Sequence, residues 1–282
     1  MSARVHAFMM PREGDVISPV MRDCFALLRG SGCDVTWSIP DHVAVRPADL
    51  TPAHDLLLLK SQAPAALSLA AVLHAQGAEI LNPYPACAAA QDKVVAIHRL
   101  ATFGVPVPDT WASAAPAQLA GALPDGALVA KPFDGYHGTG VRFLERSAEL
   151  TEIPSGDRMC MVQPRLAGAD DLKVYVIGDD VFGVRKQFDP DSHGRAGRPV
   201  TLSDEVVEVA RQCGAAFGFG LYGVDLVETD DGPVVVDVNH FPGYKGVPDA
   251  AERLASYVLH HLESPSDLSL PPLPRATAAV GR

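Results

Sequence analysis

Two neighbouring stretches decide the fold of this chain: Gly223-Val224-Asp225-Leu226-Val227-Glu228 and, after a short turn, Pro233-Val234-Val235-Val236-Asp237-Val238-Asn239. Both read as strands, and they are predicted to end with three oxygen ligands, Asp225, Asp237 and Asn239. Side chains alternate between the two faces of a strand, so Asp237 and Asn239 point the same way. Hard oxygen ligands suit Mg²⁺, or Mn²⁺, which keeps part of its shell for substrate phosphates. The alternative is a hairpin with solvated polar side chains, since acidic strand ends are common.

Composition limits the class of protein. The chain has 282 residues, of which 48% are hydrophobic and 20% are charged, a balance typical of soluble globular proteins. A net charge of −11 argues against a general nucleic-acid binder. Five cysteines without a C-x-x-C pair favour reduced thiols over disulfides or zinc. No secretory signal and no apolar run of about 18 residues is visible, so we expect a cytoplasmic protein without a membrane partner.

The first 90 residues alternate strand and helix, which predicts a small parallel sheet covered by helices. The four apolar residues of 56–59 are typical of a buried parallel strand. The expected strands are residues 4–10, 33–38, 55–60 and 79–81, and the expected helices are residues 16–29 and 64–76.

Two further units follow this sheet, with a turn region at 82–91 before them. In the first we expect a helix at 92–103 and strands at 127–133, 140–145 and 158–165. In the second we expect strands at 172–177 and 181–187, a mobile polar loop at 189–198, a helix from Ser203 to Phe217, the hairpin above and a helix at 248–262. Residues 264–282 are rich in Pro, Ser and Ala, which predicts a disordered tail.

A glycine-bearing loop joins two strands at Lys131-Pro132-Phe133-Asp134-Gly135-Tyr136-His137-Gly138-Thr139-Gly140. Its three glycines let backbone N–H groups turn toward an anion, and Lys131 adds a point charge for phosphate. The sequence therefore predicts a phosphate-binding hairpin loop. The alternative is a flexible glycine hairpin in which His137 is structural or solvated.

Other cations stand at positions where a polyanion could be bound. Lys93 falls in the first turn of a helix, where the alternative is a solvated side chain. Lys173 shares a strand face with Tyr175 and not with the core, and Arg185 extends the neighbouring strand. Lys60 closes a buried strand at its carboxyl end, where parallel sheets present ligands. These residues could equally form a basic solvent face.

The order of these elements resembles that of the ATP-grasp superfamily, over about residues 1–263. The resemblance implies an α/β (α+β) fold in which two lobes clamp ATP. Residues 1–90 would be an N-terminal α/β substrate domain. Residues 91–166 would be the central lobe with a glycine lid loop, and residues 167–263 the C-terminal lobe with the Mg²⁺ site.

The resemblance also implies a role for each matching residue. Lys93 and Lys131 would hold the α- and β-phosphates of ATP, and Lys173 would approach the γ-phosphate. The loop from Asp134 to Gly140 would close as a lid, with Gly135, His137, Gly138, Thr139 and Gly140 at the phosphates. The remaining roles are adenine recognition by Gln163 and the backbone of Pro164, Arg165 and Leu166, ribose contact by Asp171 (Asp170 fits almost as well), and Mg²⁺ binding by Asp225, Asp237 and Asn239.

Two subfamilies share features with this chain. RimK-type glutamate ligases carry an Arg-Ser-Asn-rich loop near the acyl phosphate, and residues 189–198 offer only Arg195 and Arg198 there. Most such ligases have Glu where this chain has Asp237. Inositol trisphosphate kinases share the Lys60 strand end, the His137-Gly138-Thr139 loop and the stretch after Asn239 with Gly243 and Lys245, which would contact substrate.

Both subfamilies imply transfer of the γ-phosphoryl group of ATP. A carboxylate–amine ligase would pass it to a carboxylate, and Lys173, Arg185, Arg195 and Arg198 would be catalytic. A kinase would pass it to the hydroxyl of a polyol phosphate, and its pocket would need many more cations to bind that polyanion. The whole chain has only 23 Lys plus Arg against 34 Asp plus Glu. The balance favours a ligase acting on a small carboxylic acid and an amine. A non-catalytic nucleotide sensor is the third hypothesis, and the oligomeric state stays open.

Overall fold

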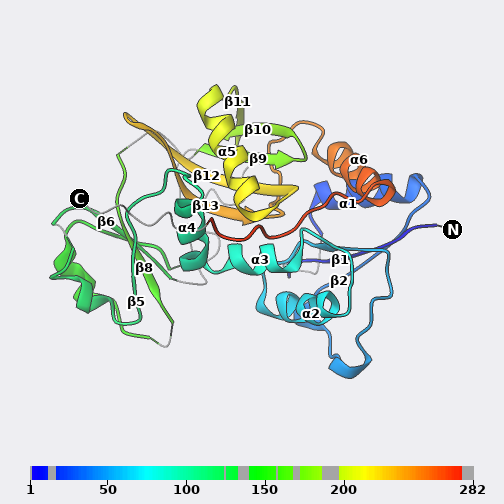
Figure 1. Cartoon of the computed structure of the whole chain (residues 1–282), viewed down its shortest axis with the longest axis horizontal. Helices are drawn as coiled ribbons and strands as arrows, with labels where there is room; N and C mark the ends of the chain where they lie inside the picture. Colours follow the sequence, from blue (N-terminus) through cyan, green and yellow to red (C-terminus); the bar gives the residue numbers. More distant parts are fainter. Residues whose placement is uncertain are drawn as a thin grey trace.

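The computed structural model describes residues 2–11, 17–123, 125–132, 140–156, 158–167, 172–185 and 197–274. Three β-sheets lie in a row along the long axis of the molecule (Figure 1). The N-terminal sheet has strand order β2-β1-β3-β4 and is parallel throughout, as expected. Its elements are β1 (Arg4–Phe8), α1 (Pro19–Gly30), β2 (Asp34–Ser38), β3 (Leu56–Leu59), α2 (Pro64–Ala75) and β4 (Ile80–Leu81).

The central sheet is antiparallel and has its own small core. Its strand order is β5-β8-β6-β7, with β5 (Trp111–Ser113), β6 (Leu128–Pro132), β7 (Arg142–Leu144) and β8 (Cys160–Pro164). Leu128, Ala130 and Val162 face the core, and the 3₁₀ segments Pro116–Leu119 and Ser147–Glu152 bring Leu119 and Leu150 to it. Alternation leaves Val129, Lys131 and Gln163 on the opposite face.

The C-terminal sheet is antiparallel, with strand order β11-β10-β9-β12-β13. Its elements are β9 (Leu172–Ile177), β10 (Asp180–Arg185), β11 (Arg198–Val200), α5 (Asp204–Phe217), β12 (Leu221–Thr229), β13 (Gly232–His240) and α6 (Ala250–Glu263). Arg198 was expected in a mobile loop, but it begins β11 and pairs with Arg185 of β10. The rest of that loop, 189–196, lies outside the described residues.

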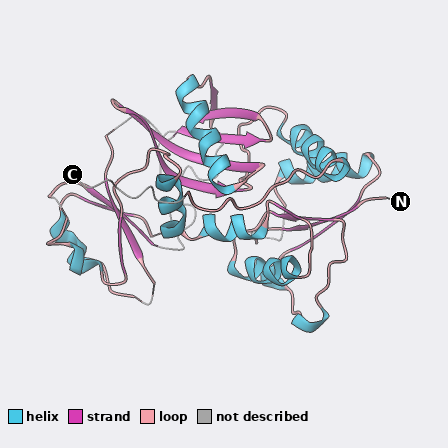
Figure 2. Cartoon of the chain, in the orientation of Figure 1, coloured by secondary structure: helices cyan, strands magenta, loops and turns pink. Residues whose placement is uncertain are grey.

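A helix occupies the region that the sequence predicts as a turn. α3 (Tyr84–Gln91) follows Pro83 and buries Ala86, Cys87 and Ala90, and α4 (Lys93–Thr102) begins directly after it. The side chain of Asp92 caps α4 by accepting from the N–H groups of Val94 and Val95. Figure 2 shows these two helices in the middle of the molecule. Among the helices of the described residues, none has the length and apolar character needed to cross a membrane.

The N-terminal sheet shares its hydrophobic cores with the C-terminal sheet. One core contains Leu59 of β3 and Val174 of β9, together with residues of α5. The other contains Leu58 of β3 and Ile177 of β9, together with residues of α1 and α6. Tyr175 belongs to the second core and is buried, so the expectation that it faces away from a core is wrong. The segment after β13 covers Tyr175, whose ring centre lies 5.6 Å from that of Tyr244.

Asn82 joins the end of β4 to the start of β12. Its side chain is fully buried; Oδ1 accepts from the N–H groups of Gly220 and Leu221 at 3.0 Å, and Nδ2 donates to the Leu221 carbonyl at 2.6 Å. One amide thereby satisfies three buried backbone groups.

We expect Asn82→Ala to lower the free energy of unfolding by about 3 kcal/mol, because each buried group left unpaired costs about 1–3 kcal/mol. Urea unfolding measures the change. Asn82→Asp is the harsher comparison: it keeps the acceptor oxygen but buries a charge and sets a second oxygen against the Leu221 carbonyl, so its loss should be at least as large. Equal stability of Asn82→Ala and the wild type would contradict the conclusion that the Asn82 side chain stabilises the contact between β4 and β12.

The C-terminal segment also differs from its prediction. Residues 264–274 were expected to be disordered, but Leu268 and Leu270 pack against the two shared cores. Arg99 of α4 donates to the Ala216 carbonyl at 2.6 Å and to the carbonyl of Pro271. In Figure 1 this segment, coloured red, runs from α6 across the middle toward α4. The buried side chain of Arg99 thus stabilises a segment whose composition alone predicts disorder. Residues 275–282 lie outside the described residues.

A polar cluster on the N-terminal sheet predicts acid sensitivity. The ring of His6 bonds the hydroxyls of Thr36 and Ser38 at 2.7 and 2.9 Å and stacks on His54. Burial, and secondarily His54, lowers the pKa of His6 from 6.5 to about 4.

Between these two pKa values the unfolded chain binds a proton that the folded chain does not, so stability falls as the pH drops from 6.5 to 4. Urea unfolding at pH 7 and pH 5 should therefore show a smaller loss of stability on acidification for His6→Gln than for the wild type. His98→Gln, at an exposed position, is the control and should behave like the wild type. The same loss in all three proteins would refute this assignment.

Candidate active site

A bulge in the β12–β13 hairpin sets the direction of the predicted metal ligands. Asp225 pairs with Asp237 and Leu226 pairs with Val235, which leaves Val236 as an extra residue. The extra residue shifts the alternation, so Asp237 and Asn239 are partly exposed while Val235 and Val238 stay buried. The expected shared face of Asp237 and Asn239 is confirmed. Their expected position at a strand end is confirmed for Asn239, the penultimate residue of β13, but is wrong for Asp225 and Asp237, because both strands continue beyond them.

Three lysines from three elements converge on this hairpin. Lys93 Nζ of α4 lies 2.7 Å from Asp237 Oδ1, and Lys173 Nζ of β9 lies 2.6 Å from Asp225 Oδ2. Lys131 Nζ of β6 donates to the carbonyl of Val236, the bulged residue, at 3.1 Å. The central sheet, the C-terminal sheet and α4 therefore each contribute a cation to the same acidic strand pair.

Lys93 is not the solvated helical side chain of the alternative interpretation. Only 15% of its side chain is exposed, and it stands at the first position of α4. A cation there is disfavoured by the helix dipole. The ion pair with Asp237 offsets that cost and holds the Lys93 ammonium beside the hairpin.

The carboxyl edge of the N-terminal sheet meets the far end of the same hairpin. Lys60, directly after β3, places Nζ 5.4 Å from the centre of the Phe241 ring, and Gln62 Nε2 donates to Asn239 Oδ1 at 3.2 Å. Gln62 was missed from the sequence. Its position three residues beyond the carboxyl end of a parallel strand is the signal that could have found it.

The segment after β13 has a strained backbone. Phe241 and Tyr244 are non-glycine residues with φ of 42° and 50°, and both are buried. Tyr244 donates to the Val176 carbonyl at 3.1 Å, which fixes the turn that carries Gly243 and Lys245 half-buried beside it. Such strain is concentrated at functional sites.

Arg185 lies at the other end of the hairpin from Lys60. It forms an ion pair with Glu228, close to the β12–β13 turn, and pairs in register with Arg198, which is exposed. The structure thus brings Lys93, Lys131 and Lys173 together, but it separates Arg185 and Arg198 from the Lys60 end. Arg195 lies outside the described residues.

The residues expected to read adenine lie on β8 and directly after it. Gln163 shares the sheet face of Lys131, is 2% exposed and donates to Thr110 Oγ1 at 2.9 Å. Pro164 ends the strand and Leu166 is half-buried. Arg165 lies 3.4 Å from Glu145. Thr110 was not predicted and carries no sequence signal.

The glycine loop is described only at its end. Gly140 has φ of 77°, and a Cβ there would lie 3.0 Å from Pro132. The positions Gly135, His137, Gly138, Thr139 and Asp171 lie outside the described residues.

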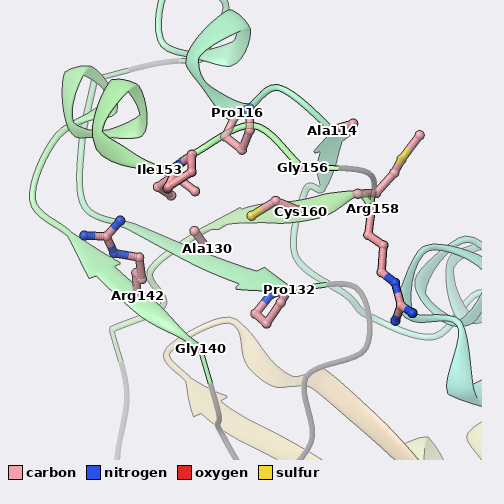
Figure 3. A pocket seen from close by; sticks show the side chains of 12 residues that line it. Ala114, Pro116, Ala130, Pro132, Gly140, Arg142, Ile153, Gly156, Arg158 and Cys160 are labelled. Atoms are coloured by element: carbon pink, nitrogen blue, oxygen red, sulfur yellow. The ribbon is translucent and has the colours of Figure 1, made fainter.

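A pocket of about 190 Å³ lies on the back of the central sheet (Figure 3). Ala130, Pro132 and Cys160 line it, and these residues alternate with Lys131 and Met161 along β6 and β8. The pocket is therefore on the opposite face from the lysine cluster and is not part of this site.

The donor set of the hairpin fits a hard cation. Within the described part of the chain, no three His, Cys, Asp or Glu side chains form a metal cluster. Asp225 and Asp237 are cross-strand partners, however, and Asn239 adds an amide oxygen on the face of Asp237. Two carboxylates and one amide oxygen are ligands that Mg²⁺ accepts.

Comparison with solved structures places the fold among ATP-grasp proteins. A RimK domain ATP-grasp protein from Sphaerobacter thermophilus matches with a TM-score of 0.73 at 22% identity, covering 91% of this chain and 100% of that one. The D-cycloserine synthetase DcsG matches with a TM-score of 0.71 at 19% identity, covering 92% and 99%. The ATP-grasp ligase PsnB, complexed with precursor peptide and AMPPNP, matches at 0.64 and 17%, covering 92% and 97%.

The sequence comparison identifies the family. The family model of the RimK-like ATP-grasp domain matches residues 90–258. "Probable alpha-L-glutamate ligase" of Haemophilus influenzae is 28% identical over 203 residues, which is 65% of this chain and 67% of that protein. The protein of the same name from Mannheimia succiniciproducens is 26% identical over 257 residues, or 84% and 83%. This chain belongs to the RimK-like ATP-grasp family.

Proposed function

We propose that this protein is an ATP-dependent carboxylate–amine ligase that releases ADP and phosphate. The observation that carries the proposal is the convergence of Lys93, Lys131 and Lys173 on a hairpin with an all-oxygen donor set. The family and its glutamate-ligase relatives support a ligase. DcsG and PsnB, a synthetase and a ligase by name, share its fold.

Each lysine would exchange partners when the nucleotide binds. Lys93 and Lys131 would turn from Asp237 and the Val236 carbonyl to the α- and β-phosphates, and Lys173 would turn from Asp225 to the γ-phosphate. The exchange would free Asp225 and Asp237 to hold Mg²⁺ together with Asn239. The cation would neutralise phosphate charge. Most of the catalysis would come from positioning and charge neutralisation.

The acceptor carboxylate would attack the γ-phosphorus, and ADP would leave. The resulting acyl phosphate would then be attacked at its carbonyl carbon by an amine, which forms the amide as phosphate leaves and a proton is lost from nitrogen. Lys60 lies at the carboxyl edge of the N-terminal sheet and contacts Phe241, which precedes Gly243 and Lys245 in the chain, and we place the substrate beside these residues. Arg185, Arg195 and Arg198 remain candidates for contact with the acyl phosphate, and Arg185 would first have to leave Glu228.

The proposed reaction implies a division of labour among three units of the chain. We assign the substrate domain to residues 1–90, the central lobe to 91–166 and the C-terminal lobe to 167–263. A small-molecule kinase is the second candidate, favoured by the Lys60 strand end and by the turn with Gly243 and Lys245. A nucleotide sensor without chemistry is the third candidate. It would bind Mg-ATP through the same lysines and oxygen donors, so turnover is what distinguishes it from an enzyme.

A substrate screen tests the proposal. ATP turnover is measured with Mg²⁺ and pooled amino acids, small acids and inositol phosphates, and the products are weighed. An amide formed together with ADP supports the ligase. An alcohol that gains one phosphoryl group refutes it in favour of the kinase, and nucleotide binding without turnover in any pool favours the sensor.

A further inference from the structure

The loop after β3 runs antiparallel to the end of β13. Three successive residues of the loop contact three successive residues of the strand end, in reverse order. The pairs are Gln62 with Asn239, Ser61 with His240, and Lys60 with Phe241. These contacts fix the register of the N-terminal sheet on the strand that carries the proposed cation ligands.

The backbone that carries Gln62 is held firmly. Its N–H donates to Met10 Sδ at 3.2 Å, and the hydroxyl of Ser61, which is fully buried, donates to the same sulfur at 3.2 Å. The Ser61 carbonyl accepts from His240 Nε2 at 3.4 Å, and its hydroxyl also accepts from the N–H of Ala63. The Gln62 side chain therefore leaves a loop that is tied to both β1 and β13.

An asparagine ligand needs its amide to be oriented, unlike an aspartate. Only Oδ1 of Asn239 can bind a cation, because the NH₂ group is a donor without a free lone pair. Gln62 Nε2 donates to that oxygen at 3.2 Å. A carbonyl oxygen has two lone pairs, so Oδ1 can accept from Gln62 and still face the side of Asp237.

We propose that Gln62 is a positioning residue that orients the amide of Asn239 for the cation. The proposal rests on the proposed function, in which Asn239 is a cation ligand. Through this contact the N-terminal sheet sets the geometry of a site built on the C-terminal sheet. Loss of a partner that orients a metal ligand typically costs about 10–100-fold in metal affinity or activity.

The experiment measures the affinity for Mn²⁺, in the presence of a non-hydrolysable ATP analogue, by electron paramagnetic resonance. We expect Gln62→Met, which keeps the length of the side chain and removes the amide, to weaken Mn²⁺ binding by about tenfold or more. The matched control is Gln76→Met, the same change in the N-terminal unit, where Gln76 Nε2 donates to the Leu50 carbonyl at 2.8 Å. It should bind Mn²⁺ like the wild type, and thermal midpoints report whether both variants are folded.

A second background tests whether Gln62 acts through Asn239. The two oxygens of a carboxylate are equivalent, so in Asn239→Asp the further change Gln62→Met should alter Mn²⁺ affinity much less. Unchanged affinity in Gln62→Met, or the same fold loss in both backgrounds, would overturn the proposal. Asp237→Ala separates the two failures: if it binds Mn²⁺ like the wild type, the cation site itself is wrong, and if it loses Mn²⁺ while Gln62→Met does not, only the positioning role is wrong.

Discussion

Asp237→Ala is expected to lower ATP-dependent turnover by at least about a thousandfold, which corresponds to several kcal/mol of lost charge stabilisation. Asp237 is the proposed ligand that both shares a strand face with Asn239 and pairs with Asp225 across the hairpin. The substitution also removes the ion-pair partner of Lys93. ADP release at saturating Mg²⁺, with a substrate pool that supports turnover, measures the effect.

Asp230→Ala is the matched control for this substitution. Asp230 is an exposed carboxylate at the turn of the same hairpin, so its loss changes the net charge equally without touching the site. We expect near-normal turnover and an unchanged thermal midpoint from Asp230→Ala. Asp237→Ala should stay folded with a lower midpoint, because it removes the ion pair with Lys93. Near-normal turnover of a folded Asp237→Ala protein would show that the metal assignment is wrong.

Lys131→Ala should weaken binding of ATP by about ten- to a hundredfold. A charge-assisted contact contributes about 1.5–3 kcal/mol, and each 1.4 kcal/mol is a factor of ten in affinity. Lys131 reaches from the central sheet to the carbonyl of Val236 and so stands between the two lobes. Calorimetry with a non-hydrolysable ATP analogue and Mg²⁺ measures the dissociation constant.

Lys60→Ala is the comparison for Lys131→Ala. Lys60 lies at the Phe241 end of the site, on the N-terminal sheet, where we place the acceptor substrate. The same calorimetric measurement should show little change for Lys60→Ala. Equal losses of ATP affinity in the two variants would contradict the division between a nucleotide side and a substrate side.

The sequence predicted the shared strand face of two proposed cation ligands but not the bulge beside them. The spacing of Asp237 and Asn239 is enough to put both side chains on one face. Three consecutive valines, 234–236, give no sign of which of them is the bulged residue. The bulge depends on pairing with β12, which a single strand does not reveal.

Long-range contacts explain the other differences. The helix α3 was missed because two prolines at 83 and 85 read as a turn, although a proline fits the first turn of a helix. Residues 264–274 have a composition typical of disorder, but the packing of Leu268 and Leu270, the contact from Arg99 and the bond from the Ser266 N–H to His261 Nδ1 hold this segment against the rest of the fold. Gln62 was missed because its partner, Asn239, is distant in sequence.

The most direct test of the proposed ligation follows oxygen atoms. A pool of carboxylic acids enriched with ¹⁸O in the carboxyl group is incubated with the protein, Mg-ATP and amines, and the released phosphate is analysed by mass spectrometry. If an acyl phosphate forms and the amine displaces phosphate, the account predicts phosphate that carries one ¹⁸O atom, together with an amide and ADP. ADP formation with the phosphoryl group kept on a hydroxyl of the product, and no labelled phosphate, would contradict it.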